Sequence, residues 1–308
     1  MKRAPIKLLN NLTAIALIAA VGLTSCGKDN DDPDLPQIGG YNNSNEVAST
    51  NLKAHWSFDG TLNERISSAA PVTSLKSSFV AGVKGQAVKL DSGFILYPTI
   101  AALNSDIGSF SVSTWIFTQN QGDGTRPTGV FALTLGAGAQ RDWNDGPILI
   151  SLENGRPTTY NDTLVIKTNI ATTKAGSLLK GDNINDFGAR EVDFKTVKGV
   201  NKWTHVVARW DGSGSFIDFY ANGVRVSNNN FRFREAAGVG FGPMTLPAGT
   251  STQVLFGGYP NATNGFPLSQ LQGFQGLFRG NIDETRFFNK ALTDDEIKAL
   301  YELELAGR

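Results

Sequence analysis

The stretch that decides the fold is residues 203–226, which read WTHVVARWDGSGSFIDFYANGVRV. Apolar residues alternate with smaller or polar ones in residues 203–210 and again in residues 215–221, as is typical of β-strands. Asn222-Gly223 follows the second run and precedes residues 224–226, and Asn-Gly favours a type I′ turn because both residues tolerate positive φ. The sequence therefore predicts a β-hairpin here.

Similar apolar runs, separated by Gly, Asn or Asp, continue on both sides of this hairpin. Residues 110–117 carry large side chains on both faces, which is typical of a strand covered on both sides. Further strands are expected at residues 52–58, 86–90, 94–97, 129–135, 148–152, 164–168, 254–257 and 281–288. This series of short strands, in a chain with 34 Gly and 12 Pro, predicts an all-β fold of two packed antiparallel sheets.

One helix is expected near the C-terminal end. Thr293-Asp294-Asp295-Glu296 has the pattern of a capping box, and Leu292 and Ile297 occupy the positions of a hydrophobic staple. The short amphipathic helix that follows cannot form a core alone, so we expect it to cover an edge of the sandwich.

Composition excludes several classes of protein. The chain has 308 residues, 28 Lys+Arg against 28 Asp+Glu, and 40% hydrophobic residues, which excludes a disordered chain and a strongly basic nucleic-acid binder. Its single cysteine excludes intramolecular disulfides.

The N-terminal segment has the parts of a secretory signal peptide. Lys2, Arg3 and Lys7 precede the apolar run at residues 12–21, which is too short to span a bilayer. The ending Leu23-Thr24-Ser25-Cys26 resembles a bacterial lipobox, which implies cleavage after residue 25 and a lipid on Cys26 that anchors the protein to a membrane. The alternative is an ordinary secretory signal with an incidental cysteine.

Residues 26–50 are predicted to form a flexible acidic tether. Residues 27–50 contain one basic and five acidic residues and little that could be buried. Lys28 followed by clustered aspartates resembles the surface-export signal of Bacteroidetes lipoproteins, which implies an outer-membrane location facing the cell exterior. A merely polar linker is the alternative.

Residues 51–308 resemble the laminin-G-like, concanavalin A-like jelly-roll family. The resemblance is carried by residues 52–63, 85–91, 203–223, 278–286 and 292–297, in that order. It implies a jelly-roll β-sandwich of two antiparallel sheets with a short C-terminal helix. Residues 154–200 exceed what one strand connection needs and are not placed by this resemblance.

A catalytic centre is not expected. Glucanases of the same superfamily carry Glu-x-Asp-x-Glu on one strand, whereas the nearest match, residues 191–195, ends in Lys195. A carboxylate pair drawn from separate strands, and thus a glycoside hydrolase, stays open as an alternative. His55 and His205 both lie in strand patterns beside tryptophans and are expected to be buried and structural.

The resemblance also implies a structural calcium site. In the family, an aspartate after a Phe-Asp-Gly turn and an aspartate in a Gly-x-Ile-Asp-Glu strand meet near the sheet edge, which corresponds to Asp59 and Asp283, with Asn63 as a third ligand. The alternatives are that Asp59 accepts turn N–H groups and that Asp283 pairs with Arg286.

Carbohydrate binding requires a flat ring that stacks on the sugar and a few directional polar groups. The candidate residues are Trp143, Asn144, Asp145, Tyr160 and Tyr259, all of them among turn-forming residues. Packing at the rim of the sandwich is the alternative role. The remaining tryptophans, Trp56, Trp115, Trp203 and Trp210, lie in strand patterns and are assigned to the core.

These features predict a non-catalytic lipoprotein that captures glycans at the cell surface, with no nucleic-acid partner. An adhesion or assembly module that binds a protein is the second hypothesis, because laminin-G-like domains also do this.

Overall fold

The hairpin predicted around Asn222-Gly223 is present in the computed structural model. Strand β10 (Phe216–Ala221) pairs with β11 (Val224–Arg225), and Asn222 and Gly223 have φ of 49° and 76°, as a type I′ turn requires. The structure describes residues 35–120, 126–154 and 162–308.

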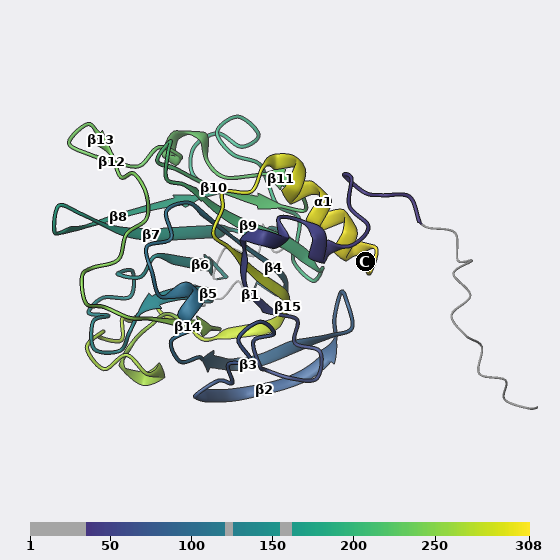
Figure 1. Ribbon diagram of the computed structural model, residues 1–308, viewed down its shortest axis with the longest axis horizontal. Helices are drawn as coiled ribbons and strands as arrows, with labels where there is room; N and C mark the ends of the chain where they lie inside the picture. The colour runs from purple at the N-terminus through teal and green to yellow at the C-terminus, as the bar shows by residue number, and fades with distance from the viewer. Residues whose placement is uncertain (1–34, 121–125, 155–161) are drawn as a thin grey trace, which may run out of the picture. The chain divides into compact units, whose positions relative to one another are not determined.

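The described residues contain one large antiparallel sheet that curls over on itself (Figure 1). Its strand order is β11-β10-β9-β4-β15-β3-β14-β5-β6-β7-β8, with β1 paired to β15 and β2 paired to β3. The other strands are β1 (Leu52–Trp56), β2 (Thr73–Ala81), β3 (Gln86–Leu96), β4 (Phe110–Thr118), β5 (Thr128–Leu135), β6 (Ile148–Leu152), β7 (Ile166–Lys174), β8 (Ser177–Ile184), β9 (Thr204–Asp211), β14 (Thr252–Phe256) and β15 (Phe278–Phe288). A small separate ribbon pairs β12 (Glu235–Ala236) with β13 (Val239–Gly240).

The curled sheet encloses one main hydrophobic core. The two ends of the sheet meet where Asn183 on β8 donates from Nδ2 to the carbonyl of Ile217 on β10, at 3.0 Å. Inside, Trp56, Phe131 and Phe256 pack edge to face, with ring centroids 5.3 to 6.2 Å apart. This arrangement confirms the predicted all-β antiparallel fold with a C-terminal helix, and the two predicted sheets are the two layers of one continuous sheet.

Two longer strands were not predicted. Most side chains of β2 are exposed and most of those of β8 are half-buried, so neither strand shows the alternation of buried and exposed residues that marks a strand packed on a core. Strands β7 and β8 form a hairpin within residues 154–200, and Ala175-Gly176 turns it with φ of 49° and 79°. Much of the unplaced region is therefore an extension of the sheet.

The helix α1 (Asp294–Leu305) has the predicted capping box. The Glu296 N–H donates to Thr293 Oγ1 at 3.1 Å, and the Thr293 N–H donates to Glu296 Oε2 at 2.8 Å. The staple residues Leu292 and Ile297 are fully buried. The helix covers the outward face of β4, β9 and β15 through a second apolar cluster, consisting of Val47, Val207, Tyr220, Phe288, Leu292, Ile297, Ala299, Leu300 and Leu303.

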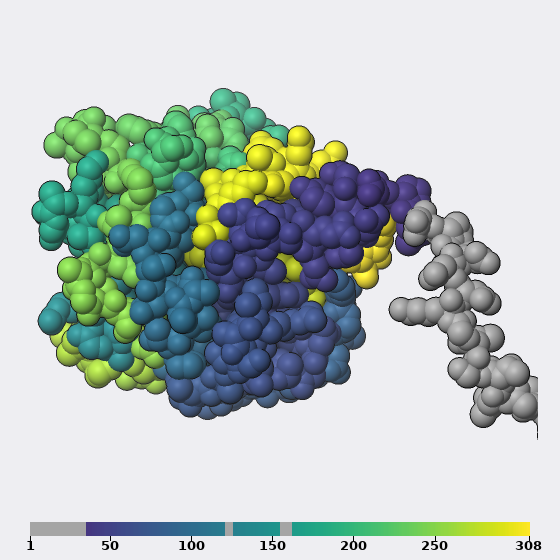
Figure 2. All heavy atoms as spheres, in the orientation of Figure 1, coloured from purple at the N-terminus to yellow at the C-terminus, as the bar shows by residue number. Residues whose placement is uncertain are grey.

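Residues 36–50 differ from the solvated tether that the sequence predicts. They belong to the same compact unit as the sheet, and Figure 2 shows them beside the C-terminal helix. Ser44 in the 3₁₀ turn η1 (Ser44–Glu46) and Val47 are buried, and the Ser44 N–H donates to the carbonyl of Arg308 at 3.2 Å. The compact unit therefore begins at Pro36. Elsewhere in the described residues, 3₁₀ turns lie in loops at η2 (Ser49–Asn51), η3 (Ala101–Leu103), η5 (Asn229–Phe231) and η6 (Ala262–Asn264).

Three of the four strand tryptophans are buried as predicted. Trp56 and Trp210 lie in the main core, whereas Trp115 points outward and is buried beneath α1, where its Nε1 donates to Glu304 Oε2 at 2.7 Å. The assignment of Trp203 to the core is wrong. It precedes β9 and is half-exposed, packing edge to face on Phe117 with ring centroids 5.9 Å apart.

Candidate functional site

A pocket of about 350 Å³ lies on the outward face of β6 and β7, on the side of the sheet opposite to the main core. Lys167 and Asn169 on β7 face this side because they alternate with Ile166 and Ile170, which point into the core. We call it the aromatic pocket; its lining residues are Pro127, Trp143, Glu153, Lys167, Asn169, Tyr259 and Phe274.

Three aromatic rings from two loops meet in this pocket. Trp143 lies 5.5 Å from Tyr259 and 5.6 Å from Phe274 between ring centroids, and Tyr259 lies 5.7 Å from Phe274. All three pairs pack edge to face, with interplanar angles of 74°, 79° and 89°. Tyr259 is buried, Trp143 is half-buried and Phe274 is exposed, so the cluster is anchored inside the fold and opens to solvent.

The loop that carries Trp143 is held by buried polar side chains. Gln140 accepts from the Leu135 N–H at 2.7 Å and donates to the carbonyl of Asp142 at 2.6 Å. Asp145 accepts from two backbone N–H groups of the same loop, at 2.8 and 3.0 Å, and its other oxygen lies 2.6 Å from Lys180 Nζ on β8. These contacts fix the position of Trp143 relative to the sheet.

The loop that carries Tyr259 and Phe274 is held by amide side chains. Asn261 and Asn264 both donate to the carbonyl of Tyr259, at 3.1 and 2.6 Å, and together they form a capping box around the 3₁₀ turn η6. Asn261 also donates to Gln275 Oε1 at 2.9 Å. Both sides of the aromatic cluster are therefore preorganised.

The inner end of the pocket holds a buried acceptor without a partner. Asn169 is 6% exposed, and its Oδ1 has no hydrogen-bond partner among the described residues. A buried amide oxygen left unpaired costs about 1–3 kcal/mol, so a ligand hydroxyl that donates to it would recover that free energy. Lys167, which pairs with Asp182 at 2.9 Å, and Glu153 provide further polar groups at the same pocket.

The structure brings together only some of the candidate residues. Trp143 and Tyr259 share the pocket. Asn144 and Asp145 do not line it and instead bind Lys180, whose Nζ donates to the Asn144 Oδ1 at 2.8 Å. Tyr160 lies outside the described residues. Sequence reasoning missed the strand residues Lys167 and Asn169; the alternation in residues 166–170 was the available signal.

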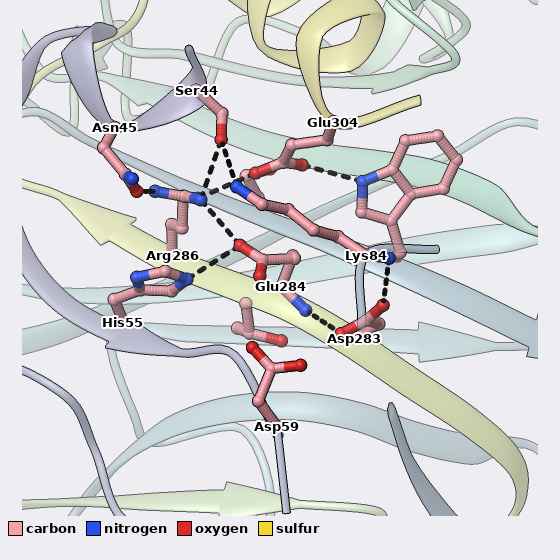
Figure 3. A network of polar contacts seen from close by, with 12 residues as sticks. Ser44, Asn45, His55, Asp59, Lys84, Asp283, Glu284, Arg286 and Glu304 are labelled. Atoms are coloured by element: carbon pink, nitrogen blue, oxygen red, sulfur yellow. Dashed lines mark hydrogen bonds and ion pairs between the residues drawn. The ribbon is translucent and has the colours of Figure 1, made fainter. Parts of the chain in front are cut away.

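Two of the three predicted calcium ligands lie at one turn. Asp283 Oδ2 accepts from the N–H groups of Val83 and Lys84, at 2.7 and 3.2 Å, and Asp59 Oδ1 accepts from the N–H of Gln86 at 2.8 Å. Figure 3 shows the Asp59 carboxylate lying near Asp283. Burial raises the pKa of Asp283 to about 7. Both carboxylates thus hold the turn between β2 and β3.

Few side chains around this turn could act as metal ligands. In the described chain, no group of three Asp, Glu, His or Cys side chains is placed to hold a metal ion. Asn63 is exposed at the surface. Calcium takes six to eight oxygen ligands, so Asp59 and Asp283 would need carbonyl oxygens and water to complete its shell. Calcium binding stays a prediction.

Melting in the presence of calcium or of chelator tests this prediction. At a Kd of about 10⁻⁴ M, 1 mM Ca²⁺ would add about 1.4 kcal/mol to the free energy of unfolding. We expect a higher melting temperature in calcium for the wild type and no such shift for Asp59→Ala. The exposed Asp91→Ala is the matched control. An identical melting temperature in calcium and chelator would contradict the prediction.

A buried polar network lies beneath α1 and η1 (Figure 3). Arg286 donates from Nη2 to Glu284 at 2.6 Å and from Nε to Glu304 at 2.8 Å, and His55 lies 2.8 Å from Glu284. Burial raises the pKa of Glu304, although Arg286 opposes this. Burial would also raise the pKa of Glu284, but the hydrogen bond with His55 and the charge of Arg286 lower it. All four groups are almost fully buried, so the network is structural.

The prediction that both histidines are buried is confirmed. His55 is 4% exposed, and His205 is fully buried with its Nε2 2.7 Å from Ser113 Oγ. Asp283 does not pair with Arg286, which is bound to the glutamates and to the N-terminal segment.

Comparison with protein families decides the family. Residues 91–298 match the concanavalin A-like lectin/glucanases superfamily. The chain belongs to this superfamily. A search of curated proteins finds no match.

Two solved neurotoxin binding domains share the fold of this chain at low sequence identity, and a third solved structure resembles it more weakly. The binding domain of botulinum neurotoxin serotype G is 13% identical with a TM-score of 0.53, over 82% of this chain and 51% of that one. The binding domain of botulinum neurotoxin DC in complex with SialylT is 16% identical with a TM-score of 0.50, over 84% and 52%. Domain 4 of AbnA, a GH43 extracellular arabinanase from Geobacillus stearothermophilus in complex with arabinotriose, is 19% identical with a TM-score of 0.45, over 81% and 98%. The chain spans about half the length of the neurotoxin binding domains.

A superfamily that includes glucanases raises the question of a carboxylate pair. Retaining glycosidases need two carboxyl groups about 5 to 5.5 Å apart. Glu191 and Asp193 lie in a turn, where Asp193 accepts from the Ala189 N–H at 2.7 Å, so they do not share a strand face. The aromatic pocket itself contains one carboxylate, that of Glu153.

Among the described residues, no helix is long and apolar enough to cross a membrane.

Proposed function

We propose that this protein is a non-catalytic, surface-displayed lipoprotein that binds glycans in the aromatic pocket. The observation that carries the proposal is the unpartnered, buried Oδ1 of Asn169 beside the half-exposed ring of Trp143. A sugar ring presents C–H groups that stack on an aromatic face and hydroxyl groups that donate to a fixed acceptor. The neurotoxin DC binding domain, which shares the fold, is in complex with SialylT.

A binding role without hydrolysis fits the charges of the pocket. Glu153 is its one carboxylate and lies with Lys167 among the lining residues. Glycoside hydrolysis needs a second carboxyl group, as nucleophile or general base, and none of the other described residues that line this pocket carries one.

Display at the surface is supported by the N-terminal sequence. Cys26 follows the pattern of a lipid-attachment site, and nine residues separate it from Pro36, where the compact unit begins. Cys26 itself lies outside the described residues. We propose that acyl chains on Cys26 hold the domain on the outer membrane, facing the exterior, so that ligand is concentrated close to the cell. Palmitate labelling of the wild type, absent in Cys26→Ala, tests this anchoring.

A glycan array tests the binding proposal. Residues 36–308 form one compact unit, so a soluble form that lacks the first 26 residues retains it. We expect Trp143→Ala and Asn169→Ala to weaken binding to any captured glycan by at least about tenfold, or about 1.4 kcal/mol. Phe187→Ala, which removes an exposed ring elsewhere, should bind as the wild type does.

Three outcomes separate the alternatives. Binding that survives both pocket substitutions would place the glycan elsewhere and contradict the proposed site. The absence of binding to every glycan on the array would contradict glycan binding and favour a protein partner. Release of reducing sugar from a bound glycan would show a hydrolase.

A further inference from the structure

A second groove lies on the other layer of the sheet, on the outward face of β2, β3, β15 and β4. The helix α1 and residues 36–50 cover part of the outward face of this layer, where Trp115 is buried. The part of this face that the helix does not cover contains an open groove with a volume of about 460 Å³. We call this hollow the strand groove; its lining residues are Val80, Lys89, Asp91, Phe117, Thr118, Gln119, Arg279, Gly280 and Asn281.

Strand register aligns three lining residues of the groove with the neighbouring Ser78 in a row. Ser78 lies opposite Lys89, Lys89 opposite Asn281, and Asn281 opposite Phe117. Directly opposed residues of antiparallel strands point to the same face, so these four side chains form a line across four strands. Three strand spacings of about 4.8 Å make the line about 14 Å long, and Trp203 extends it by its contact with Phe117.

The groove carries more positive than negative charge. Lys89 is exposed and has no ion-pair partner among the described residues, and Arg279 adds a second cation. Asp91 is the one carboxylate in the lining, and it lies 3.1 Å from Arg279 with both side chains more than half exposed. An exposed pair of this kind contributes about 0–1 kcal/mol, so an incoming carboxylate could compete for the guanidinium.

The rest of the lining suits an extended polar ligand. Asn281 supplies an amide, and the partly exposed rings of Phe117 and Trp203 lie at one end of the row. A protein interface would need a buried apolar centre with aromatic anchors. In this groove the middle of the row is instead occupied by Lys89 and Asn281.

We propose that the strand groove is a second binding site that accepts an acidic glycan, with a uronate carboxylate bound between Lys89 and Arg279 and a neighbouring sugar ring against Phe117. The site is separate from the aromatic pocket, which lies on the other layer of the sheet. Its ligand class follows from the net positive charge, the linear row of polar groups and the aromatic end.

Matched polymers test the proposal by calorimetry. Oligogalacturonate and oligomannuronate are compared with their methyl esters, which have the same rings without the negative charge. We expect binding of at least one acid form, weaker binding in 0.5 M NaCl because salt screens the pair, and at least tenfold weaker binding of its ester. Lys89→Gln and Arg279→Gln should each reduce affinity for the acid form by about fivefold to tenfold.

Two control variants keep the outcomes distinct. Lys298→Gln removes an exposed lysine from α1 and should bind as the wild type does. Trp143→Ala removes a ring of the aromatic pocket and should leave uronate binding in the strand groove unchanged. The two proposed sites are therefore tested independently of each other. Failure of both acid forms to bind, equal affinity for acid and ester, or full affinity in Lys89→Gln would overturn the proposal, provided that melting shows each variant to be folded.

Discussion

Arg286→Met is expected to destabilise the domain by about 3–5 kcal/mol, the range found when one partner of a buried ion pair is removed. The guanidinium is fully buried on β15 and bound on every side. It contacts Glu284 and Glu304, at 2.6 and 2.8 Å, and donates to Asn45 and Ser44 of the N-terminal segment at 2.9 and 3.1 Å. Methionine fills similar space but leaves both glutamates buried without their cation.

Thermal and urea unfolding measure this effect. For a domain of this size each kcal/mol lowers the melting temperature by about 2–4 °C, so we expect a fall of about 10 °C. Adding Glu304→Gln to the variant should restore part of the loss, because it removes one of the uncompensated charges. Proteolysis within residues 36–50 should also become faster, because two contacts that hold this segment are lost.

The matched control lies on the same strand. Arg279 pairs with Asp91 at 3.1 Å, but this pair is exposed, so Arg279→Met should change stability by no more than about 1 kcal/mol. A loss of less than about 1 kcal/mol in Arg286→Met as well would show that the buried network contributes little to stability.

Most of the fold could be predicted because its strands bury one or both faces. Residues 203–226 and 110–117 place large apolar side chains in the core at every second position, and that alternation is visible in the sequence. Strand β2 could not be predicted, because it is exposed along nearly its whole length and is defined by backbone pairing with β3. Backbone hydrogen bonding between strands does not require a particular pattern of side chains, so an exposed strand cannot be recognised from its sequence.

The candidate site was predictable only in its aromatic part. Trp143 and Tyr259 stand out because large rings among turn-forming residues are conspicuous in a sequence. Asn169 is not conspicuous: its role depends on β7 lying next to β6 in the observed register, which buries the amide under loops from elsewhere in the chain. The buried network around Arg286 could not be predicted for a similar reason, because its contacts join residues far apart in the chain: Asn45 and Arg286 are 241 residues apart.

The chain has two histidines, and His205 is expected to make the domain less stable in acid. Burial, with a smaller effect from Arg286, lowers the pKa of His205 to about 3 in the folded state, against about 6.5 for an unperturbed histidine. At pH values between about 3 and 6.5, His205 is protonated in the unfolded chain but not in the folded chain. The contribution of His205 to the free energy of unfolding therefore falls as the pH falls from about 6.5. The slope is about 1.4 kcal/mol per pH unit.

Other buried groups titrate in the same range, so the effect must be isolated. Burial also lowers the pKa of His55, which acts in the same direction. The pKa of Asp283 is raised to about 7, so the folded state binds this proton more readily, and acid strengthens the fold through that residue. The pH dependence of the wild type alone is therefore the sum of opposing contributions.

Comparison with His205→Gln removes these shared contributions. Glutamine keeps a side-chain group near Ser113 but does not titrate, so the variant lacks the acid-dependent loss. We expect the advantage of the wild type over the variant, in free energy of unfolding by urea, to be about 2–3 kcal/mol smaller at pH 4.5 than at pH 7.5. Because only the change with pH is used, any loss of packing against Trp115 and Tyr301 cancels. A difference that stays constant across this range would mean that the folded state binds the His205 proton as readily as the unfolded chain does, and that burial there does not exclude the charged imidazole.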